Sequence, residues 1–140
     1  MNILLAVAAA ALVSAAPPPS PTATPDIGPG GFEMTTYYLA LLYRGPKWTP
    51  EETAETRAIQ DGHMANIQRL AKEGKLLLAG PFTDGGDLRG IFVFKVGSMQ
   101  EAQDLAAADP AVKAGRLRLD IHPWYSARNI TVSARSPSTP

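Results

Sequence analysis

The stretch His63-Met-Ala-Asn-Ile-Gln-Arg-Leu-Ala-Lys-Glu-Gly-Lys-Leu-Leu-Leu-Ala-Gly-Pro-Phe82 predicts the end of a helix, a turn and a strand. Its first half belongs to residues 49–73, where apolar residues recur at the three- and four-residue intervals of a helix. Gly74 favours the left-handed conformation that ends many helices. Leu76–Ala79 is typical of a short strand, ended by Gly80-Pro81. The stretch predicts a helix that packs on a sheet and leads directly into one of its strands.

A histidine stands in the middle of the apolar stripe of this helix. The stripe consists of Ile59, His63, Ile67 and Leu70. A titratable ring among apolar side chains needs a hydrogen-bond partner, because burying it unpaired costs about 1–3 kcal/mol. We therefore expect His63 to find a partner on another element.

The residues on either side predict the neighbouring elements. Thr49-Pro50-Glu51-Glu52 favours a helix start with the threonine as N-cap. Before it, Tyr37–Tyr43 is rich in strand formers. After the central stretch, Thr83–Asp87 is a turn sequence. It predicts a hairpin that joins the strand Leu76–Ala79 to a second strand at Leu88–Val96.

The last third of the domain predicts a helix and a final strand. A capping box at Ser98 opens a helix through about Ala108, and Asp109-Pro110 ends it. Residues 111–115 would add one short helical turn. Leu117–His122 alternates apolar and polar residues, which is typical of a half-buried strand.

The predicted order is β-α-β-β-α-β, which favours an α+β, ferredoxin-like fold. It would have one antiparallel four-stranded sheet with both helices on one face. We expect Tyr37, Tyr38, Phe92 and Phe94 to place apolar groups on the open face. An uncovered apolar face favours association, so we predict a homodimer through the open sheet face.

Composition excludes several classes of function. The 13 basic and 13 acidic residues cancel and are scattered, so nothing indicates a nucleic-acid partner. The chain has no cysteine, which excludes disulfides, a thiolate nucleophile and a cysteine-ligated metal. Its two histidines lie in different predicted elements without metal-binding spacing, so we expect no metal and no cofactor.

The ends of the chain differ from the domain in composition. Met1–Ala16 combines a short apolar run with small-residue cleavage patterns, which predicts a signal peptide. The run is too short to span a bilayer. We expect a Pro/Gly-rich linker at 17–34, the domain at 35–128 and a disordered tail at 129–140. The protein would then be exported, periplasmic or secreted. A start at Met34 would make it cytoplasmic.

Three segments in this order and spacing resemble one known family, the YciI-like (YCII-related) proteins, over Tyr37–Tyr125. They are His63, Gly74-Lys-Leu-Leu-Leu-Ala-Gly-Pro-Phe82 and Asp109-Pro-Ala-Val-Lys-Ala-Gly115. The resemblance implies a ferredoxin-like protomer, a dimeric α+β barrel with a sheet-lined pocket, and a histidine–aspartate catalytic pair. It also implies kinship with muconolactone-isomerase-type proteins, some relatives of which act on lactones, including dehalogenation.

In this fold the end of the second helix, with Asp109, should pack near the middle of the first helix, with His63. A carboxylate that accepts from one ring nitrogen would fix the tautomer and leave the other nitrogen as a base. Gly80-Pro81-Phe82 would form a wall of a substrate pocket. Arg116 or Arg89 could neutralise a substrate carboxylate.

Each of these residues also has a purely structural interpretation. His63 can be a satisfied core histidine, Asp109 an Asx turn before a proline, and the two arginines surface residues. Two hypotheses therefore stay open. One is an acid–base enzyme of lactone or carbonyl isomerase, hydrolase or dehalogenase type. The other is a non-catalytic dimer module that binds a small-molecule ligand or is purely structural.

Overall fold

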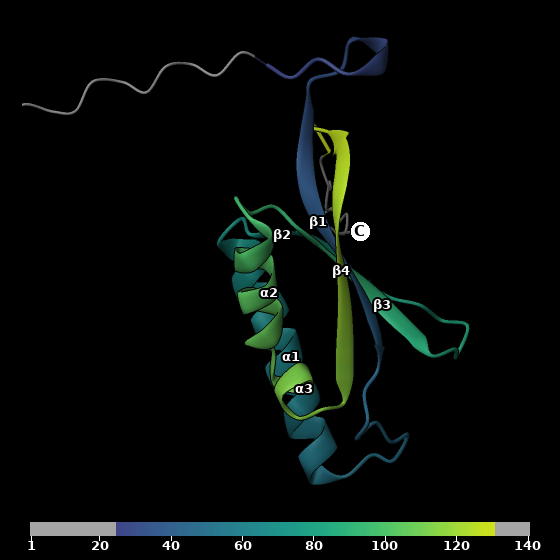
Figure 1. Ribbon diagram of the computed structural model, residues 1–140. Coiled ribbons are helices and arrows are strands. Elements are labelled where there is room, and N and C mark those ends of the chain that lie inside the picture. Colours follow the sequence, from purple (N-terminus) through teal and green to yellow (C-terminus); the bar gives the residue numbers. More distant parts are fainter. Residues whose placement is uncertain (1–24, 131–140) are drawn as a thin grey trace, which may run out of the picture.

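The computed structural model describes residues 25–130, which form one antiparallel sheet with helices on one face (Figure 1). The sheet order is β2-β3-β1-β4. The predicted fold class is confirmed. The predicted signal peptide, the linker up to residue 24 and the tail from residue 131 lie outside the described residues. After one 3₁₀ turn at Pro29–Gly31, the elements in chain order are β1 Met34–Arg44, α1 Ala54–Lys72, β2 Leu76–Pro81, β3 Leu88–Phe94, α2 Met99–Ala107, α3 Pro110–Lys113 and β4 Leu117–Ala127.

The first helix begins later than the sequence predicted. Thr53 is its N-cap: the Thr53 hydroxyl accepts from the Thr56 N–H at 3.1 Å, and the Thr56 hydroxyl accepts from the Thr53 N–H at 2.8 Å. The Thr49 hydroxyl only accepts from the Glu51 N–H, at 3.2 Å. The segment contains two competing caps, and the one at Thr53 satisfies two backbone donors at once. The predicted start at Thr49 was therefore wrong.

Both edge strands run further than predicted, and each contains a proline. β2 continues through Gly80 and Pro81, which we expected to end it. β4 continues past His122 through Pro123 to Ala127. A proline lacks the N–H that a central strand needs, but an edge strand tolerates it because only one side is paired. The predicted alternation in the first half of β4 is confirmed, with Leu117, Leu119 and Ile121 half-buried and Arg118, Asp120 and His122 exposed.

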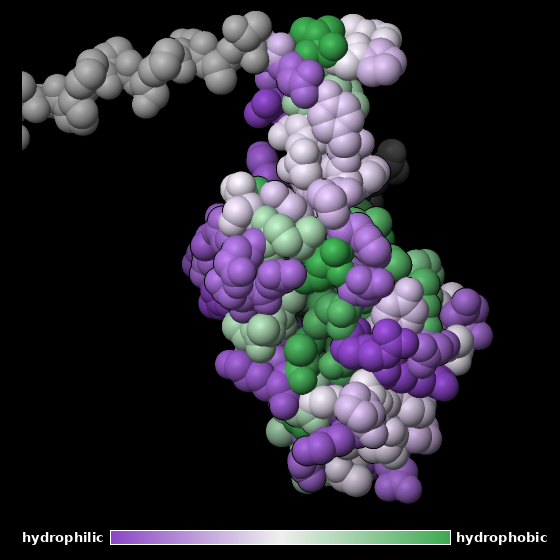
Figure 2. Space-filling model, in the orientation of Figure 1, coloured by the Kyte–Doolittle hydropathy of each residue, from purple (hydrophilic) through white to green (hydrophobic). Residues whose placement is uncertain are grey.

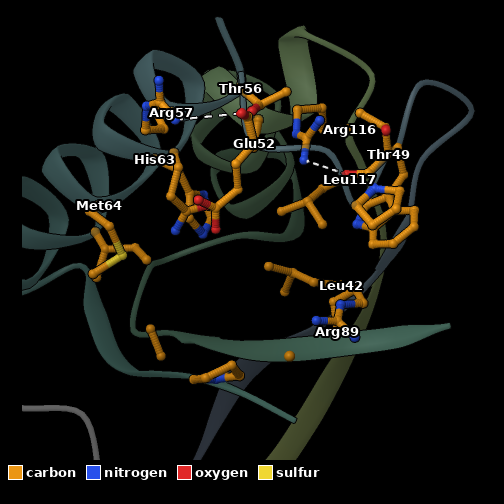
Figure 3. Close-up of a pocket in the computed structure, with 18 of the residues that line it drawn as sticks. Leu42, Thr49, Glu52, Thr56, Arg57, His63, Met64, Arg89, Arg116 and Leu117 are labelled. Carbon is orange, nitrogen blue, oxygen red and sulfur yellow. Dashed lines mark hydrogen bonds between the residues drawn. The ribbon is translucent and has the colours of Figure 1, made fainter. Parts of the chain in front are cut away.

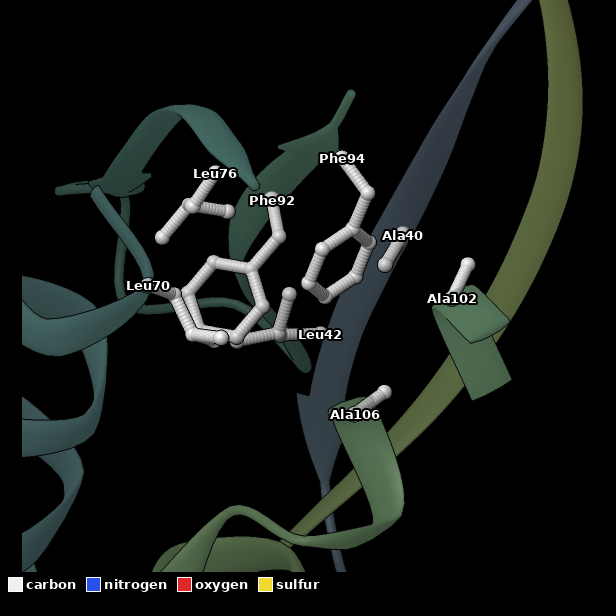
Figure 4. Packing of buried hydrophobic residues seen from close by; sticks show 8 residues of the cluster. All are labelled: Ala40, Leu42, Leu70, Leu76, Phe92, Phe94, Ala102 and Ala106. Carbon is white, nitrogen blue, oxygen red and sulfur yellow. The ribbon is translucent and has the colours of Figure 1, made fainter. Parts of the chain in front are cut away.

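The hydrophobic core lies between the sheet and the helices. Phe92 is 2% exposed and Phe94 0%, and both pack here with Leu70 (Figure 4). They were predicted on the open face, and that prediction was wrong. Phe92 pairs with Ala40, so both phenylalanines share the helix-facing side. Tyr38 also packs against this core, so its predicted place on the open face was wrong too. Figure 2 shows apolar surface in a band between the helix layer and the strands.

The opposite face of the sheet carries aliphatic residues instead. Leu39 pairs with Val93 and Leu41 with Ile91, so these residues point away from the helices. Tyr37 belongs to this face but is only 1% exposed. Its hydroxyl donates to the Arg128 carbonyl at 2.8 Å, and its ring lies 6.0 Å from that of Trp124.

Residues 25–33, which we expected in an extended linker, contact the far end of the sheet. The Met34 N–H donates to the Asp26 carbonyl at 2.7 Å, and Ile27 forms an isolated bridge with Glu33. The Tyr125 hydroxyl donates to the Asp26 carboxylate at 2.6 Å. Within residues 25–130, no helix has the length and apolar character needed to cross a membrane.

Candidate functional site

A histidine and an aspartate meet where α1 packs on α3. Nδ1 of the His63 ring lies 2.9 Å from Oδ1 and 3.0 Å from Oδ2 of Asp109. Asp109 is 0% exposed and His63 8%. The His63 ring also stacks on Phe92, with ring centroids 5.8 Å apart. The expected partner of the histidine on another element is therefore Asp109.

Besides the His63 ring, two further groups donate hydrogen bonds to the aspartate, one from α1 and one from α3. Its Oδ1 accepts from the Ala111 N–H at 2.9 Å, which makes Asp109 the N-cap of α3. Its Oδ2 accepts from the Asn66 amide at 2.9 Å. Asp109 is therefore both the cap of α3 and the partner of His63, because its two carboxylate oxygens together accept all these hydrogen bonds.

These contacts decide the charge of the aspartate. Burial raises the pKa of the Asp109 carboxyl, but the hydrogen bond and charge of His63, with the hydrogen bonds from Asn66 and Ala111, lower it by more. The pKa therefore lies below its usual value, and the group is ionised at neutral pH. An ionised carboxylate can only accept, so Nδ1 of His63 carries a proton. In the neutral ring, the lone pair is then on Nε2.

Asn66 links the pair to a chain of polar residues that the sequence analysis missed. Its Oδ1 accepts from Nη2 of Arg69 at 2.8 Å, and Nη1 of Arg69 donates to Glu73 at 2.8 Å. Asn66, Arg69 and Glu73 follow His63 at three- and four-residue intervals, so they share one side of α1. That spacing was visible in the sequence, but only the position of Asp109 shows that these polar residues connect to the His63–Asp109 pair.

A cavity of about 670 Å³ lies beside the His63 ring, between α1, the β1–α1 loop and the β2–β3 hairpin (Figure 3). Among the described residues, Nε2 of His63 has no hydrogen-bond partner. The apolar part of the lining consists of Leu42, Trp48, Pro50, Met64, Ile67, Ala79, Pro81, Phe92, Ala111 and Leu117. Apart from His63, the polar and small part consists of Thr49, Glu51, Glu52, Thr56, Arg57, Gln60, Gly80, Arg89, Gly90 and Arg116.

Most of the predicted pocket residues line this cavity, and one does not. Gly80, Pro81 and Arg116 are part of the wall, as is Arg89. Phe82 is 39% exposed and lies outside the lining. Its place in the wall was therefore wrongly predicted, because the strand continues through Gly80-Pro81 and carries Phe82 past the cavity.

The cavity has further lining residues that the sequence analysis did not single out. Five consecutive residues of the β1–α1 loop, 48–52, face it, as do Arg57 and Gln60 of α1. Within residues 25–130, no group of three or more His, Cys, Asp or Glu side chains is placed to hold a metal ion.

Comparison with known proteins gives three similarities. The sequence model of the YCII-related domain matches residues 36–125. The uncharacterized protein YjpA of Bacillus subtilis (strain 168) is 34% identical over 87 residues, which cover 62% of this chain and 92% of YjpA. Among solved structures, the chain is similar to 5-chloro-2-hydroxyhydroquinone dehydrochlorinase (TftG) from Burkholderia phenoliruptrix AC1100 in complex with 2,5-dihydroxybenzoquinone. That similarity has a TM-score of 0.45 and 23% identity, and it covers 61% of this chain and 92% of TftG.

Proposed function

The chain belongs to the family of YCII-related domains, and we propose that this member is an acid–base enzyme for a small carbonyl compound. His63 would carry the proton, and Asp109 would position the His63 ring. One observation supports this: the His63 ring lines a cavity, and its Nδ1 pairs with the buried, ionised carboxylate of Asp109. A base held in one tautomer with its other nitrogen unpaired is suited to proton transfer.

The proposed reaction begins when Nε2 takes a proton from a carbon next to the carbonyl group. The electron pair of the broken C–H bond moves toward the carbonyl oxygen, and the charge of Asp109 stabilises the imidazolium that forms. Return of the proton to a different atom completes an isomerisation. Loss of a halide from the neighbouring carbon completes a dehalogenation. If Nε2 takes the proton from water instead, the resulting hydroxide attacks the carbonyl carbon of a lactone, which is hydrolysis.

The test is turnover of a panel of lactones and halogenated cyclic ketones by three variants. His63→Ala and Asp109→Asn should each lower turnover of any compound the wild type converts, the first by about 100-fold or more. His122→Ala is the matched control, because His122 is exposed and pairs only with Asp120, at 3.3 Å. Turnover that survives both substitutions would show that the pair is not the catalytic centre.

A non-catalytic module is the second candidate, and the capping of α3 by Asp109 favours it. The same carboxylate joins α1 to α3 through His63 and Asn66, which is what a structural connection requires. In that case His63→Ala should cost about 1–3 kcal/mol of unfolding free energy. It should leave the affinity for a bound small molecule unchanged. Loss of binding in a variant of unchanged stability would rule out this candidate.

We also propose that two copies associate through the open sheet face. An apolar hollow on that face is lined by Leu39, Leu77, Leu78, Ile91, Val93, Trp124 and Ile130. Leu78→Glu should convert a dimer into a monomer in analytical ultracentrifugation, since Leu78 is 37% exposed there. Met64→Glu is the control, because Met64 has a similar exposure, 44%, but lies on α1. An equal effect of both, or a wild-type monomer, would contradict the proposal.

Export is the remaining proposal, and the composition of Met1–Ala16 supports it. Expression of the full chain followed by cell fractionation and N-terminal sequencing tests it. We expect the product outside the cytoplasm, with an N-terminus a few residues after Val13. A cytoplasmic product that begins at Met1 or Met34 would contradict it.

A further inference from the structure

Three arginines, Arg57, Arg89 and Arg116, line the cavity, and within residues 25–130 their side chains donate hydrogen bonds only to backbone carbonyls. Nη2 of Arg116 donates to the Thr49 carbonyl at 3.0 Å, and Nη1 of Arg89 donates to the Gly86 carbonyl at 3.3 Å. Nη1 of Arg57 donates to the Glu52 carbonyl at 3.5 Å. A guanidinium has five N–H donors, so most of them stay available. Backbone carbonyls hold these side chains in place without neutralising their charge.

Three of the other four arginines in the described chain behave differently, and the fourth, Arg44, donates to the Gly85 carbonyl at 2.8 Å. Arg69, Arg118 and Arg128 form ion pairs with Glu73, Asp87 and Glu33, at 2.6–3.1 Å. Within residues 25–130, none of the cavity arginines forms an ion pair. Of the four arginines in this range without an ion pair, three line the cavity, and the fourth, Arg44, lies over the Trp48 ring with its Cζ 4.0 Å from the ring centroid.

Two acidic residues, Glu51 and Glu52, also line the cavity. They come from the β1–α1 loop and are exposed, whereas Arg89 and Arg116 are half-buried. Charges that are partly withdrawn from water interact more strongly with a ligand than exposed charges do. The half-buried part of the cavity wall is thus cationic.

Figure 3 shows where the charges lie relative to the histidine. Arg89 and Arg116 lie toward Leu42 and Leu117, and His63 lies on the other side of the view beside Met64. The histidine and these two arginines therefore line different parts of one cavity, and in this view the Glu52 side chain lies between His63 and Arg116.

We propose that the cavity takes a small organic carboxylate with a carbonyl group at its other end. The carboxylate binds Arg89 and Arg116, which can hold two oxygens in one plane. An apolar body contacts the wall, and the carbonyl end reaches His63. The position of the carbonyl end rests on the proposed function of His63, but binding of the carboxylate does not.

The test compares each carboxylate with its uncharged amide, which has nearly the same shape. The ¹⁵N-labelled full chain is titrated with 4-oxopentanoate, 2-oxocyclohexane-acetate and benzoate, each against its neutral amide. We expect at least one carboxylate to bind about tenfold more tightly than its amide, with shifts at Arg89 and Arg116. Arg89→Gln and Arg116→Gln should each remove this preference. Arg118→Gln is the matched control, since Arg118 is exposed and paired with Asp87 at 3.1 Å. If no carboxylate binds more tightly than its amide, the proposal is wrong.

A second readout separates this proposal from the one about His63. The same samples in D₂O report hydrogen exchange at the carbons next to the ketone of the two oxo-acids. Suppose the wild type prefers the carboxylates but exchanges hydrogen no faster than His63→Gln. That result would contradict the proposal that His63 is a base and would leave the proposed carboxylate site intact. Exchange without carboxylate preference would contradict the anion site alone. In His63→Gln the carboxylate preference should persist, because His63 does not contact Arg89 or Arg116.

Discussion

Gly62 and Pro110 touch at the point where α1 crosses α3, and they are the sequence neighbours of His63 and Asp109. A Cβ atom on Gly62 would lie 3.1 Å from Cγ of Pro110, closer than ordinary van der Waals contact. The absence of a side chain at residue 62 lets the two helices approach closely. This approach brings the Asp109 carboxylate within 2.9 Å of the His63 ring.

Gly62→Val should therefore force α1 and α3 apart. We expect a loss of about 1–3 kcal/mol of unfolding free energy in urea denaturation, because valine would overpack the contact. Valine is a better helix former than glycine, so helix propensity would oppose the loss. Gly97→Val is the control, since a Cβ there meets only Glu101, at 4.0 Å. Equal effects of the two substitutions would contradict the importance of the contact.

Asp109→Asn should lower the unfolding free energy at neutral pH by about 1–3 kcal/mol, because an amide cannot accept from all three donors that the carboxylate serves. The effect should also depend on pH. The pKa of Asp109 is lower in the folded protein than in the unfolded chain, where an aspartate has a pKa of about 3.9.

The sign of this dependence follows from the direction of the shift. The stability that ionised Asp109 contributes is fully present above the unfolded pKa, and it is lost as the pH falls through the folded pKa. The difference between wild type and Asp109→Asn should thus shrink in acid. Urea denaturation at a series of pH values from neutral downward measures it. A difference that stays constant for as long as the wild type remains folded would contradict the ionised state.

Thr53→Ala and Thr49→Ala should separate the two possible starts of α1. Loss of the Thr53 hydroxyl removes the cap and should cost about 1 kcal/mol. Thr49 accepts only from Glu51 outside the helix, so its replacement should cost less. Chemical denaturation of both variants tests this. A larger loss for Thr49→Ala would place the functional cap where the sequence suggested it.

Asp26→Asn should change the titration of Tyr125. The hydrogen bond to Asp26, with smaller contributions from burial and from the Asp26 charge, raises the pKa of the Tyr125 phenol. The substitution should bring that pKa back toward 10.0. Ultraviolet titration, with Tyr125→Phe to identify the signal, measures the change. Glu33→Gln is the control, because it breaks the neighbouring ion pair with Arg128 and leaves Tyr125 alone. An unchanged titration would show that residues 25–33 do not hold this position in solution.

The order of elements could be predicted because it depends on local signals, whereas the partner of His63, 46 residues away in sequence, followed from the expected fold and the family resemblance. Gly74 takes the left-handed φ of +71° that a helix end needs. The faces of β3 could not be predicted in the same way. Ile91, Phe92, Val93 and Phe94 are all apolar, so the alternation that assigns faces is missing there. Only the pairing with β1 decides that the two phenylalanines face the helices.

Only part of the candidate site could be predicted, because some of its residues join it through tertiary contacts alone. His63 interrupts an apolar stripe and so draws attention by itself. Nothing in the sequence distinguishes Arg57 from a surface arginine, and only the position of the β2–β3 hairpin opposite α1 makes it part of a cavity wall. The β1–α1 loop joins the same wall through a contact between residues far apart in sequence, from Arg116 to the Thr49 carbonyl.

The prolines of the two outermost strands have a consequence for how copies of the chain can aggregate. Pro81 lies in β2 and Pro123 in β4, so each free edge of the sheet lacks a backbone donor at one position. β4 also exposes Arg118, Asp120 and His122 beside its free edge. Growth into a continuous intermolecular sheet, as in amyloid, is therefore disfavoured at both edges.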